Sequence, residues 1–168
     1  MEYYWFNKKK EIKKEYDIVI IGSNTSNAYE RLDFYSNFME DYYSLYKWVV
    51  KFSEEHLDVS IALIHHASSG RDVIEEKILN NSKIKVLNKN LNSYDVAFSS
   101  KIAISFGSTM GYELNAHNLP TFFVDPGLRD SFLPKYGDNC LDKMRLRNYE
   151  EFKNTLKNAL ENQESYTY

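Results

Sequence analysis

One stretch of the chain, residues 102–127, constrains the fold more than any other. It opens with an apolar, β-branched run, which is typical of a buried parallel strand. A small polar turn follows, Gly107-Ser108-Thr109, and either hydroxyl residue can cap a helix that the pattern predicts over residues 110–117. The order of these segments therefore predicts a strand that leads through a tight turn into a helix.

A second strand completes the unit. Asn118 and Pro120 end the predicted helix, and a new apolar run covers residues 121–124. Strand, turn, helix and strand form a βαβ unit, in which the turn lies at the carboxyl end of the first strand. The N–H groups and the positive dipole end of the helix at that turn are suited to binding phosphate.

Glu113 lies four residues after Thr109, so the two side chains share one face of the predicted helix. A carboxylate one turn beyond a phosphate site can accept hydrogen bonds from two neighbouring hydroxyls, such as those of a ribose. The alternative is a capped helix with a solvated Glu, because a short S-T-x-x-x-E pattern also occurs by chance.

The segment GSTMGYELNAHNLP resembles the signature G-S-T-x-G-[YF]-E-A-x-x-x-G-x-P of GT-B glycosyltransferases that build surface polysaccharides, including capsule and Kdo-type enzymes. That signature lies in their C-terminal, donor-binding domain. The matching positions are Gly107, Ser108, Thr109, Gly111, Tyr112, Glu113 and Pro120. The resemblance implies that Gly107, Ser108 and Thr109 hold the donor phosphates. It also implies that Glu113 holds the ribose.

Two positions depart from the signature. Asn118 stands where Gly is usual, and Asn is the non-glycine residue that best tolerates a left-handed helix end. Leu114 stands where Ala is usual, so the helix has to pack a bulkier side chain against the sheet.

A second polar cluster follows the apolar run at residues 59–64. His65, His66 and Arg71 come directly after it, and cations at the carboxyl end of a strand can bind a diphosphate. The segment resembles the K-x-H-P loop of the same family, with His66 at the histidine position and Ala67 in place of the proline. A two-histidine metal site is an alternative, but neighbouring strand residues point to opposite faces, so we expect no metal. A purely structural histidine is the other alternative.

Two further segments reach the same edge of the predicted sheet. The polar loop at residues 22–27 contains Asn24 and faces the ligand crevice if the sheet is open, although an ordinary solvated loop is equally consistent. It lacks the G-x-G-x-x-G pattern of dinucleotide-binding proteins. A short helix over residues 92–99 carries Ser93 and Tyr94, which the resemblance places along the donor pocket.

Apolar runs alternate with helical patterns along the whole chain. The predicted strands cover residues 17–21, 59–64, 83–87, 102–104 and 121–124, and the predicted helices cover residues 34–56, 72–80, 92–99, 110–117 and a segment that starts at Asn148. This alternation predicts an α/β fold, a Rossmann-like, doubly wound parallel sheet with helices on both faces. The doubly wound rule gives the strand order 3-2-1-4-5 with right-handed crossovers.

The chain has 168 residues, which suggests one domain. We expect that domain over residues 17–162, after a lead segment or linker at residues 1–16 and before a tail at residues 163–168. A complete GT-B enzyme has two such domains. The resemblance therefore implies one half of an enzyme, either a fragment or a subunit, that an acceptor-binding domain or partner subunit completes.

The net charge and the cysteine content limit which classes of partner and which cellular compartment we expect. The net charge is −3, which gives no sign of a nucleic-acid partner. The single cysteine, Cys140, excludes an intramolecular disulfide and suits the reducing cytoplasm. No apolar run reaches 18 residues, so we expect no membrane span. Aromatics and lysines in residues 3–14 can touch the inner face of an anionic membrane, but glutamates interrupt them, so a linker or first helix is favoured.

Together these patterns predict a donor nucleotide-sugar binding domain of a glycosyltransferase. Charge that develops on the leaving phosphate requires oriented donors, which Ser108, Thr109, His66 and Arg71 can supply, and the nucleotide-sugar is a substrate, so no cofactor is expected. The acceptor's base is expected on the other domain, so no catalytic residue is assigned. The alternatives are a sugar-nucleotide 2-epimerase, which has the same architecture and a similar turn, and a non-catalytic nucleotide-binding or assembly module.

Overall fold

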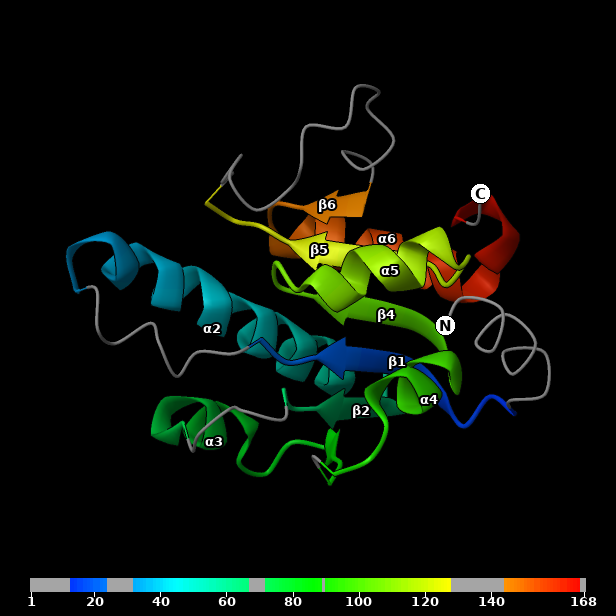
Figure 1. Ribbon diagram of the computed structural model, residues 1–168, viewed down its shortest axis with the longest axis horizontal. Coiled ribbons are helices and arrows are strands. Elements are labelled where there is room, and N and C mark those ends of the chain that lie inside the picture. The colour runs from blue at the N-terminus through cyan, green and yellow to red at the C-terminus, as the bar shows by residue number, and fades with distance from the viewer. Residues whose placement is uncertain (1–12, 24–31, 67–71, 89, 128–143, 167–168) are drawn as a thin grey trace.

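The computed structural model describes residues 13–23, 32–66, 72–88, 90–127 and 144–166 (Figure 1). Two of the predicted site residues, Asn24 and Arg71, lie outside these ranges, as do Cys140 and most of the lead segment. The strands are β1 (Tyr16–Ile21), β2 (Ile61–Ile64), β3 (Lys85–Val86), β4 (Ser100–Ser105), β5 (Thr121–Val124) and β6 (Arg145–Leu146). The helices are α2 (Leu32–Glu55), α3 (Val73–Leu79), α4 (Ser93–Phe98), α5 (Thr109–Ala116) and α6 (Tyr149–Glu161), followed by the 3-10 helix η3 (Gln163–Tyr166).

The strands form one parallel sheet in the order β3-β2-β1-β4-β5-β6. The predicted α/β fold and the order of its five strands are confirmed. The sixth strand was not predicted, because it has only two residues and one of them is Arg145. Its register is set by β5, where Val124 pairs with Leu146. The ends of the central strands are level, since Ile21 pairs with both Ile64 and Ser105.

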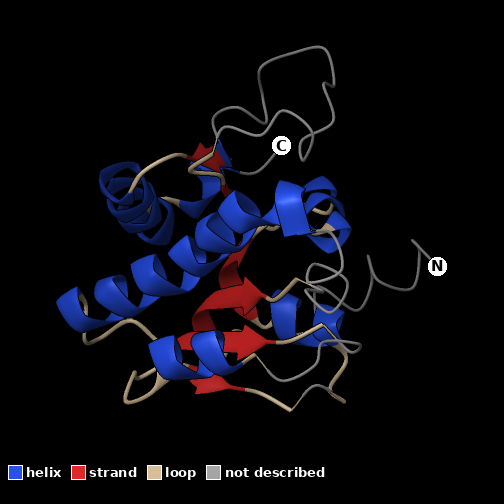
Figure 2. Cartoon of the chain, turned by 90° about the vertical axis from the view of Figure 1, so that its left-hand side faces the viewer, coloured by secondary structure: helices blue, strands red, loops and turns tan. Residues whose placement is uncertain are grey.

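Helices cover both faces of the sheet, as Figure 2 shows. Successive residues of β1 point to opposite faces. Ile18 and Ile20 pack into the core that contains α2 and α6, whereas Val19 and Ile21 pack into the core that contains α4 and α5. A strand that is buried on both faces has to be continuously apolar, which explains why these runs show no polar alternation.

The long helix α2 has 24 residues and lies close to its predicted range. Leu45, Val49 and Phe52 recur at intervals of three or four residues and are fully buried, so one face of α2 packs against the sheet. Among the described residues, no helix has the length and the hydropathy that crossing a membrane requires.

The amino-terminal edge of the sheet is held by one charged cluster. Asp17 Oδ2 accepts hydrogen bonds from Ser60 N at 2.8 Å and Ser60 Oγ at 2.7 Å. Its other oxygen, Oδ1, lies 2.7 Å from Lys101 Nζ. Burial raises the pKa of Asp17, but the bonds from Lys101 and Ser60 outweigh it, so the net pKa is lowered. One carboxylate thereby ties the starts of β1 and β4 to the residue that precedes β2.

The segment before β1 is fixed to the same edge. Lys14 Nζ donates to the carbonyl oxygens of Phe98 at 3.0 Å and Ser100 at 2.5 Å. Glu15 N donates to Ser99 O at 2.6 Å. The bond from Lys14 to Phe98 O satisfies a carbonyl that the last turn of α4 leaves without an internal partner.

Candidate functional site

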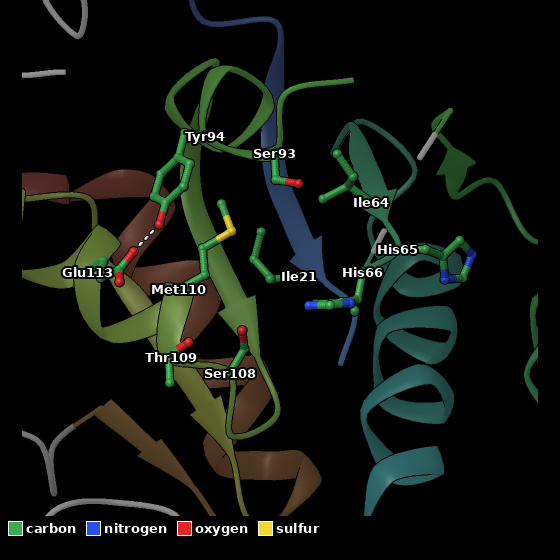
Figure 3. A pocket seen from close by; sticks show the side chains of 11 residues that line it. Ile21, Ile64, His65, His66, Ser93, Tyr94, Ser108, Thr109, Met110 and Glu113 are labelled. Carbon is green, nitrogen blue, oxygen red and sulfur yellow. Dashed lines mark hydrogen bonds between the residues drawn. The ribbon is translucent and has the colours of Figure 1, made fainter. Parts of the chain in front are cut away.

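A pocket of about 320 Å³ opens at the carboxyl ends of β1, β2 and β4 (Figure 3). Its lining residues are Ile21, Gly22, Ile64, His65, His66, Ser93, Tyr94, Ser108, Thr109, Met110 and Glu113. The chain reverses its direction of winding between β1 and β4, and open α/β sheets bind ligands at this kind of switch point. Four of the predicted donor-binding residues therefore line one cavity, His66, Ser108, Thr109 and Glu113, together with Ser93 and Tyr94 from the predicted crevice set.

The turn between β4 and α5 is shaped by Gly107, which has a φ of 63°. Only glycine adopts this conformation without strain. Gly107 itself does not line the pocket, so its part is to turn the backbone. Ser108 takes the N-cap position, but its side chain makes no capping bond within the described residues. Instead, Ser108 N donates to Ser105 Oγ at 3.3 Å, which leaves the Ser108 hydroxyl at the pocket wall.

Gly111 lets α5 lie close to the sheet. A Cβ added at this position would lie 2.8 Å from Phe123 Cε1 and 3.1 Å from Ser105 Cβ, both of which are buried. Any larger residue would push the helix away from β4 and β5. The glycine thus sets the position of the Ser108–Thr109 turn relative to the strand ends.

The two departures from the signature are accommodated at the other end of α5. Asn118 has a φ of 58° and donates to Asn115 O at 2.9 Å, while Leu119 N donates to Leu114 O at 3.0 Å. These two bonds form the helix-ending motif that normally uses glycine. Leu114 is fully buried beside Leu119 in the α4–α5 core, so the bulkier side chain fills space there.

Glu113 and Thr109 both line the pocket, as their spacing predicts. Glu113 Oε2 accepts a hydrogen bond from the hydroxyl of Tyr94 (Figure 3). Tyr94 is held by the first turn of α4, where the Asn92 side chain accepts from Tyr94 N at 3.0 Å. Burial, followed by the bond to the Glu113 carboxylate, raises the pKa of Tyr94 to about 12.

The two histidines after β2 point in opposite directions in Figure 3. The ring of His66 points into the pocket, toward the side that carries Ser108, whereas the ring of His65 points away from it. His65 Nδ1 lies 3.3 Å from Glu75 Oε1. Within the described ranges, no group of three or more His, Cys, Asp or Glu side chains could hold a metal ion.

A buried polar network behind His65 was not predicted from the sequence. Glu75 is 4% exposed and accepts from Tyr42 Oη at 2.9 Å, and Tyr42 Oη lies 2.6 Å from Tyr46 Oη. Tyr43 Oη donates to Asp72 Oδ2 at 2.9 Å, and Asp72 caps α3. Burial is the largest influence on Glu75 and raises its pKa. Tyr42 and Tyr43 thus join α2 to α3, and the contact between His65 and Glu75 joins the end of β2 to the same helix.

Several lining residues were missed because no motif marks them. Ile21, Ile64 and Met110 look like ordinary core residues in the sequence, yet each lies where a strand ends or a helix begins. Gly22 belongs to the loop at residues 22–27 that was expected to face the crevice, and a Cβ there would lie 3.1 Å from Ile64 O. A glycine directly after a buried strand indicates that two backbones approach closely at that point.

No protein-family model matches the chain, and no curated protein is detectably similar to it in sequence. Its fold resembles that of a Listeria monocytogenes protein described as a "putative UDP-N-acetylglucosamine 2-epimerase", with a TM-score of 0.57 and 15% identity over 94% of this chain. It also resembles S. aureus MnaA in a co-structure with UDP, with a TM-score of 0.57 and 14% identity over 96% of this chain. The chain spans 39% and 41% of those two proteins. At such low identity the likeness shows a shared α/β, Rossmann-like fold and no more.

Proposed function

We propose that the chain binds a nucleotide-sugar and is the donor domain of a glycosyltransferase that builds surface polysaccharide or another glycan. One observation carries the proposal: the amino-terminal turn of α5 and the carboxylate of Glu113 line the same pocket at the switch point of the sheet. A phosphate and a ribose that are joined in one nucleotide need these two kinds of group about one helical turn apart. The UDP that accompanies one structural neighbour supports this class of ligand.

The diphosphate would lie between α5 and the end of β2. Ser108 and Thr109 bring two hydroxyls and the positive end of the α5 dipole, and His66 points toward them from the opposite wall. In sugar transfer the bond from the anomeric carbon to the phosphate oxygen breaks, and negative charge develops on that oxygen. Oriented donors stabilise this charge without forming a covalent bond.

The nucleoside would lie toward α4. Glu113 would accept from the ribose hydroxyls, and the apolar side chains of Ile21, Ile64 and Met110 offer a surface for the flat face of a base or sugar. Arg71 and Asn24, which lie outside the described residues, stay in the proposal as further contacts to the donor.

The acceptor and its activating base would come from a second domain or a partner subunit. This chain spans about two-fifths of the two proteins whose fold it shares. Alignment of the attacking group can supply about 7–11 kcal/mol of a reaction barrier. One domain that orients only the leaving group should therefore bind the donor and transfer little sugar. We propose the cytoplasm as its compartment, and the inner membrane surface as a secondary location.

A sugar-nucleotide 2-epimerase domain is the second candidate, favoured by the epimerase name of one structural neighbour. The two candidates differ in the product. A transferase assembled with its acceptor-binding half releases free nucleotide and extends a glycan. An epimerase converts UDP-N-acetylglucosamine to its C2 epimer, which proton NMR detects, and leaves the nucleotide-sugar intact.

The shared proposal is tested by a thermal-shift panel followed by calorimetry. The panel contains UDP-, CMP-, GDP- and CDP-linked sugars, with free ribose and inorganic diphosphate as controls. A ligand that binds only the folded chain at one hundred times its Kd raises stability by about 2.7 kcal/mol. We expect one nucleotide class to raise the melting temperature clearly. If no member of the panel stabilises the chain, the nucleotide-sugar proposal is wrong.

A further inference from the structure

The hydroxyl of Tyr94 and the carboxylate of Glu113 meet across one side of the pocket. Tyr94 lies on α4 and Glu113 on α5, and the hydroxyl donates to Glu113 Oε2 (Figure 3). Both residues line the cavity. Glu113 is also the group to which the proposed function assigns the ribose, so this carboxylate has an internal partner as well as a proposed ligand.

We propose that Tyr94 is an internal competitor of the ribose: its hydroxyl occupies the Glu113 carboxylate, and a ligand with a cis-diol has to displace it. This inference rests on the proposed function, because it requires that Glu113 receives the ribose. It predicts that the Tyr94 hydroxyl weakens the affinity of the pocket for ribonucleotides.

The geometry of α4 favours displacement by side-chain rotation. Asn92 Oδ1 accepts from the backbone N–H groups of Tyr94 at 3.0 Å and Asp95 at 3.4 Å, which fixes the first turn. Residues 96–98 are buried against the sheet and anchor the rest of the helix. The backbone of Tyr94 is therefore held, and rotation about two side-chain torsions is enough to move its ring.

The chemistry of the carboxylate explains why the two partners compete. The vicinal hydroxyls of a ribose can donate to both oxygens of one carboxylate, and Tyr94 already donates to Oε2. The phenol is protonated at neutral pH, since burial and Glu113 raise the pKa of Tyr94 to about 12. Binding of a diol replaces one hydrogen bond to the carboxylate by two, so the diol can displace the phenol. When the nucleotide leaves, the phenol donates to Oε2 again. Tyr94 would thus limit affinity and favour release.

The test compares UDP with 2′,3′-dideoxyuridine diphosphate by calorimetry on the wild-type chain and on Tyr94→Phe. We expect Tyr94→Phe to bind UDP about three- to tenfold more tightly, because it loses a competing hydrogen bond and keeps its ring. Affinity for the dideoxy form should not change. In a Glu113→Gln background the gain from Tyr94→Phe should shrink, which a double-mutant cycle measures.

Tyr112→Phe is the matched control, because Tyr112 lies on α5, stacks on Phe123 with ring centroids 4.8 Å apart and does not line the pocket. It should leave both affinities unchanged. If the wild-type chain binds UDP and Tyr94→Phe binds it equally or more weakly, competition is wrong and the proposed function stands. Equal gains for both ligands also overturn competition, since the diol would play no part. If no variant binds either form, whether of uridine or of the nucleotide class that the thermal-shift panel selects, the proposed function fails and the inference fails with it.

Discussion

The two edges of the parallel sheet use polar residues in opposite ways. At the amino-terminal edge, the Asp17 carboxylate is bonded to Ser60 and Lys101, and Lys14 caps the end of α4. At the carboxyl-terminal edge, small and polar side chains such as Thr109 surround a cavity of about 320 Å³. The first edge satisfies its charges within the chain, and the second collects donors and acceptors around a space that a ligand can fill.

The difference follows from the direction of the strands. In a parallel sheet every strand feeds its connection into a helix at the carboxyl edge, so helix N-termini and flexible turns gather there. The amino edge receives helix C-termini, whose carbonyls attract cations such as Lys14. A charged residue at the amino edge is therefore expected to affect stability, whereas a hydroxyl at the carboxyl edge is expected to affect ligand binding. The predictions below test this separation.

The largest effect is expected at Gly111, which determines how closely α5 approaches the sheet. Gly111→Val should lower the free energy of unfolding by about 3 kcal/mol, because the added side chain collides with Phe123 and Ser105 in a packed interior. The same change should weaken the proposed nucleotide binding, since the Ser108–Thr109 turn moves with the helix. Urea denaturation measures the first effect. Ala116→Val is the matched control on the exposed side of α5 and should cost well under about 1 kcal/mol. If the urea concentration at the unfolding midpoint is the same for Gly111→Val and the wild type, α5 does not lie as close to the sheet as the structure places it.

Next in size is the loss of the Thr109 hydroxyl. Thr109→Val keeps the shape of an exposed side chain and removes the donor proposed for a charged phosphate, and such a bond is worth about 1.5–3 kcal/mol. Affinity for a nucleoside diphosphate should fall by about tenfold or more. The melting temperature without ligand should stay within about 1 °C. Calorimetry that finds equal dissociation constants for Thr109→Val and the wild type would remove the anion site from this turn.

Most of the fold follows from local sequence patterns. Runs such as residues 17–21 and 102–104 are short, mostly apolar and β-branched and end at glycine-containing polar turns, which favours strands buried on both faces, and a helix follows each of them. Helix ends were also predictable where a residue type has one clear role. Asn148 caps α6 by accepting from Glu151 N at 3.0 Å, and the Glu151 carboxylate accepts from Arg147 N at 2.9 Å.

Contacts that join distant segments were not predictable in the same way. Tyr42 and Glu75 come from different helices, and nothing in either local pattern indicates that a carboxylate is buried beneath a tyrosine pair. The short strand β6 was not predicted for a related reason, because two residues show no periodicity. It forms because its residues pair with the edge strand β5. That Thr109 and Glu113 line one pocket was predictable, because one helix fixes their spacing, whereas the contact between Tyr94 and Glu113 required the structure.

A smaller, ligand-selective effect is expected from Glu113. Glu113→Ala removes the acceptor proposed for the ribose, so affinity for UDP should fall by about tenfold, roughly the value of one hydrogen bond to a charged group at an exposed site. The dideoxy form lacks both ribose hydroxyls, so its affinity should fall little in Glu113→Ala. Competition calorimetry with the two ligands measures the difference. Equal losses would show that Glu113 supports the helix and does not contact the sugar.

The smallest effect is expected at the amino-terminal edge, from Asp17→Asn. The pKa of Asp17 is lower in the folded chain than its unfolded value of about 3.9, because the bonds from Lys101 and Ser60 outweigh burial. The charged carboxylate therefore contributes stability above that value, and the contribution is lost as pH falls through the folded pKa. Because Lys101 is 42% exposed, water and salt screen the pair, and we expect a loss of only about 0.5–1 kcal/mol at pH 7.

Urea unfolding of the wild type and Asp17→Asn between pH 7 and pH 2.5 makes that prediction quantitative. The difference in the free energy of unfolding between the two proteins should be constant from pH 7 to about pH 5. It should become smaller in acid, because protonation removes the charge from the wild-type side chain. A difference in the free energy of unfolding that stays constant down to pH 2.5 would mean that the charge of Asp17 contributes nothing to stability. Nucleotide affinity at pH 7 should be the same in both proteins, since Asp17 lies at the opposite edge of the sheet from the pocket. A loss of affinity in Asp17→Asn would break the separation between the two edges, because it would show that an ion pair at one edge controls the ligand site at the other.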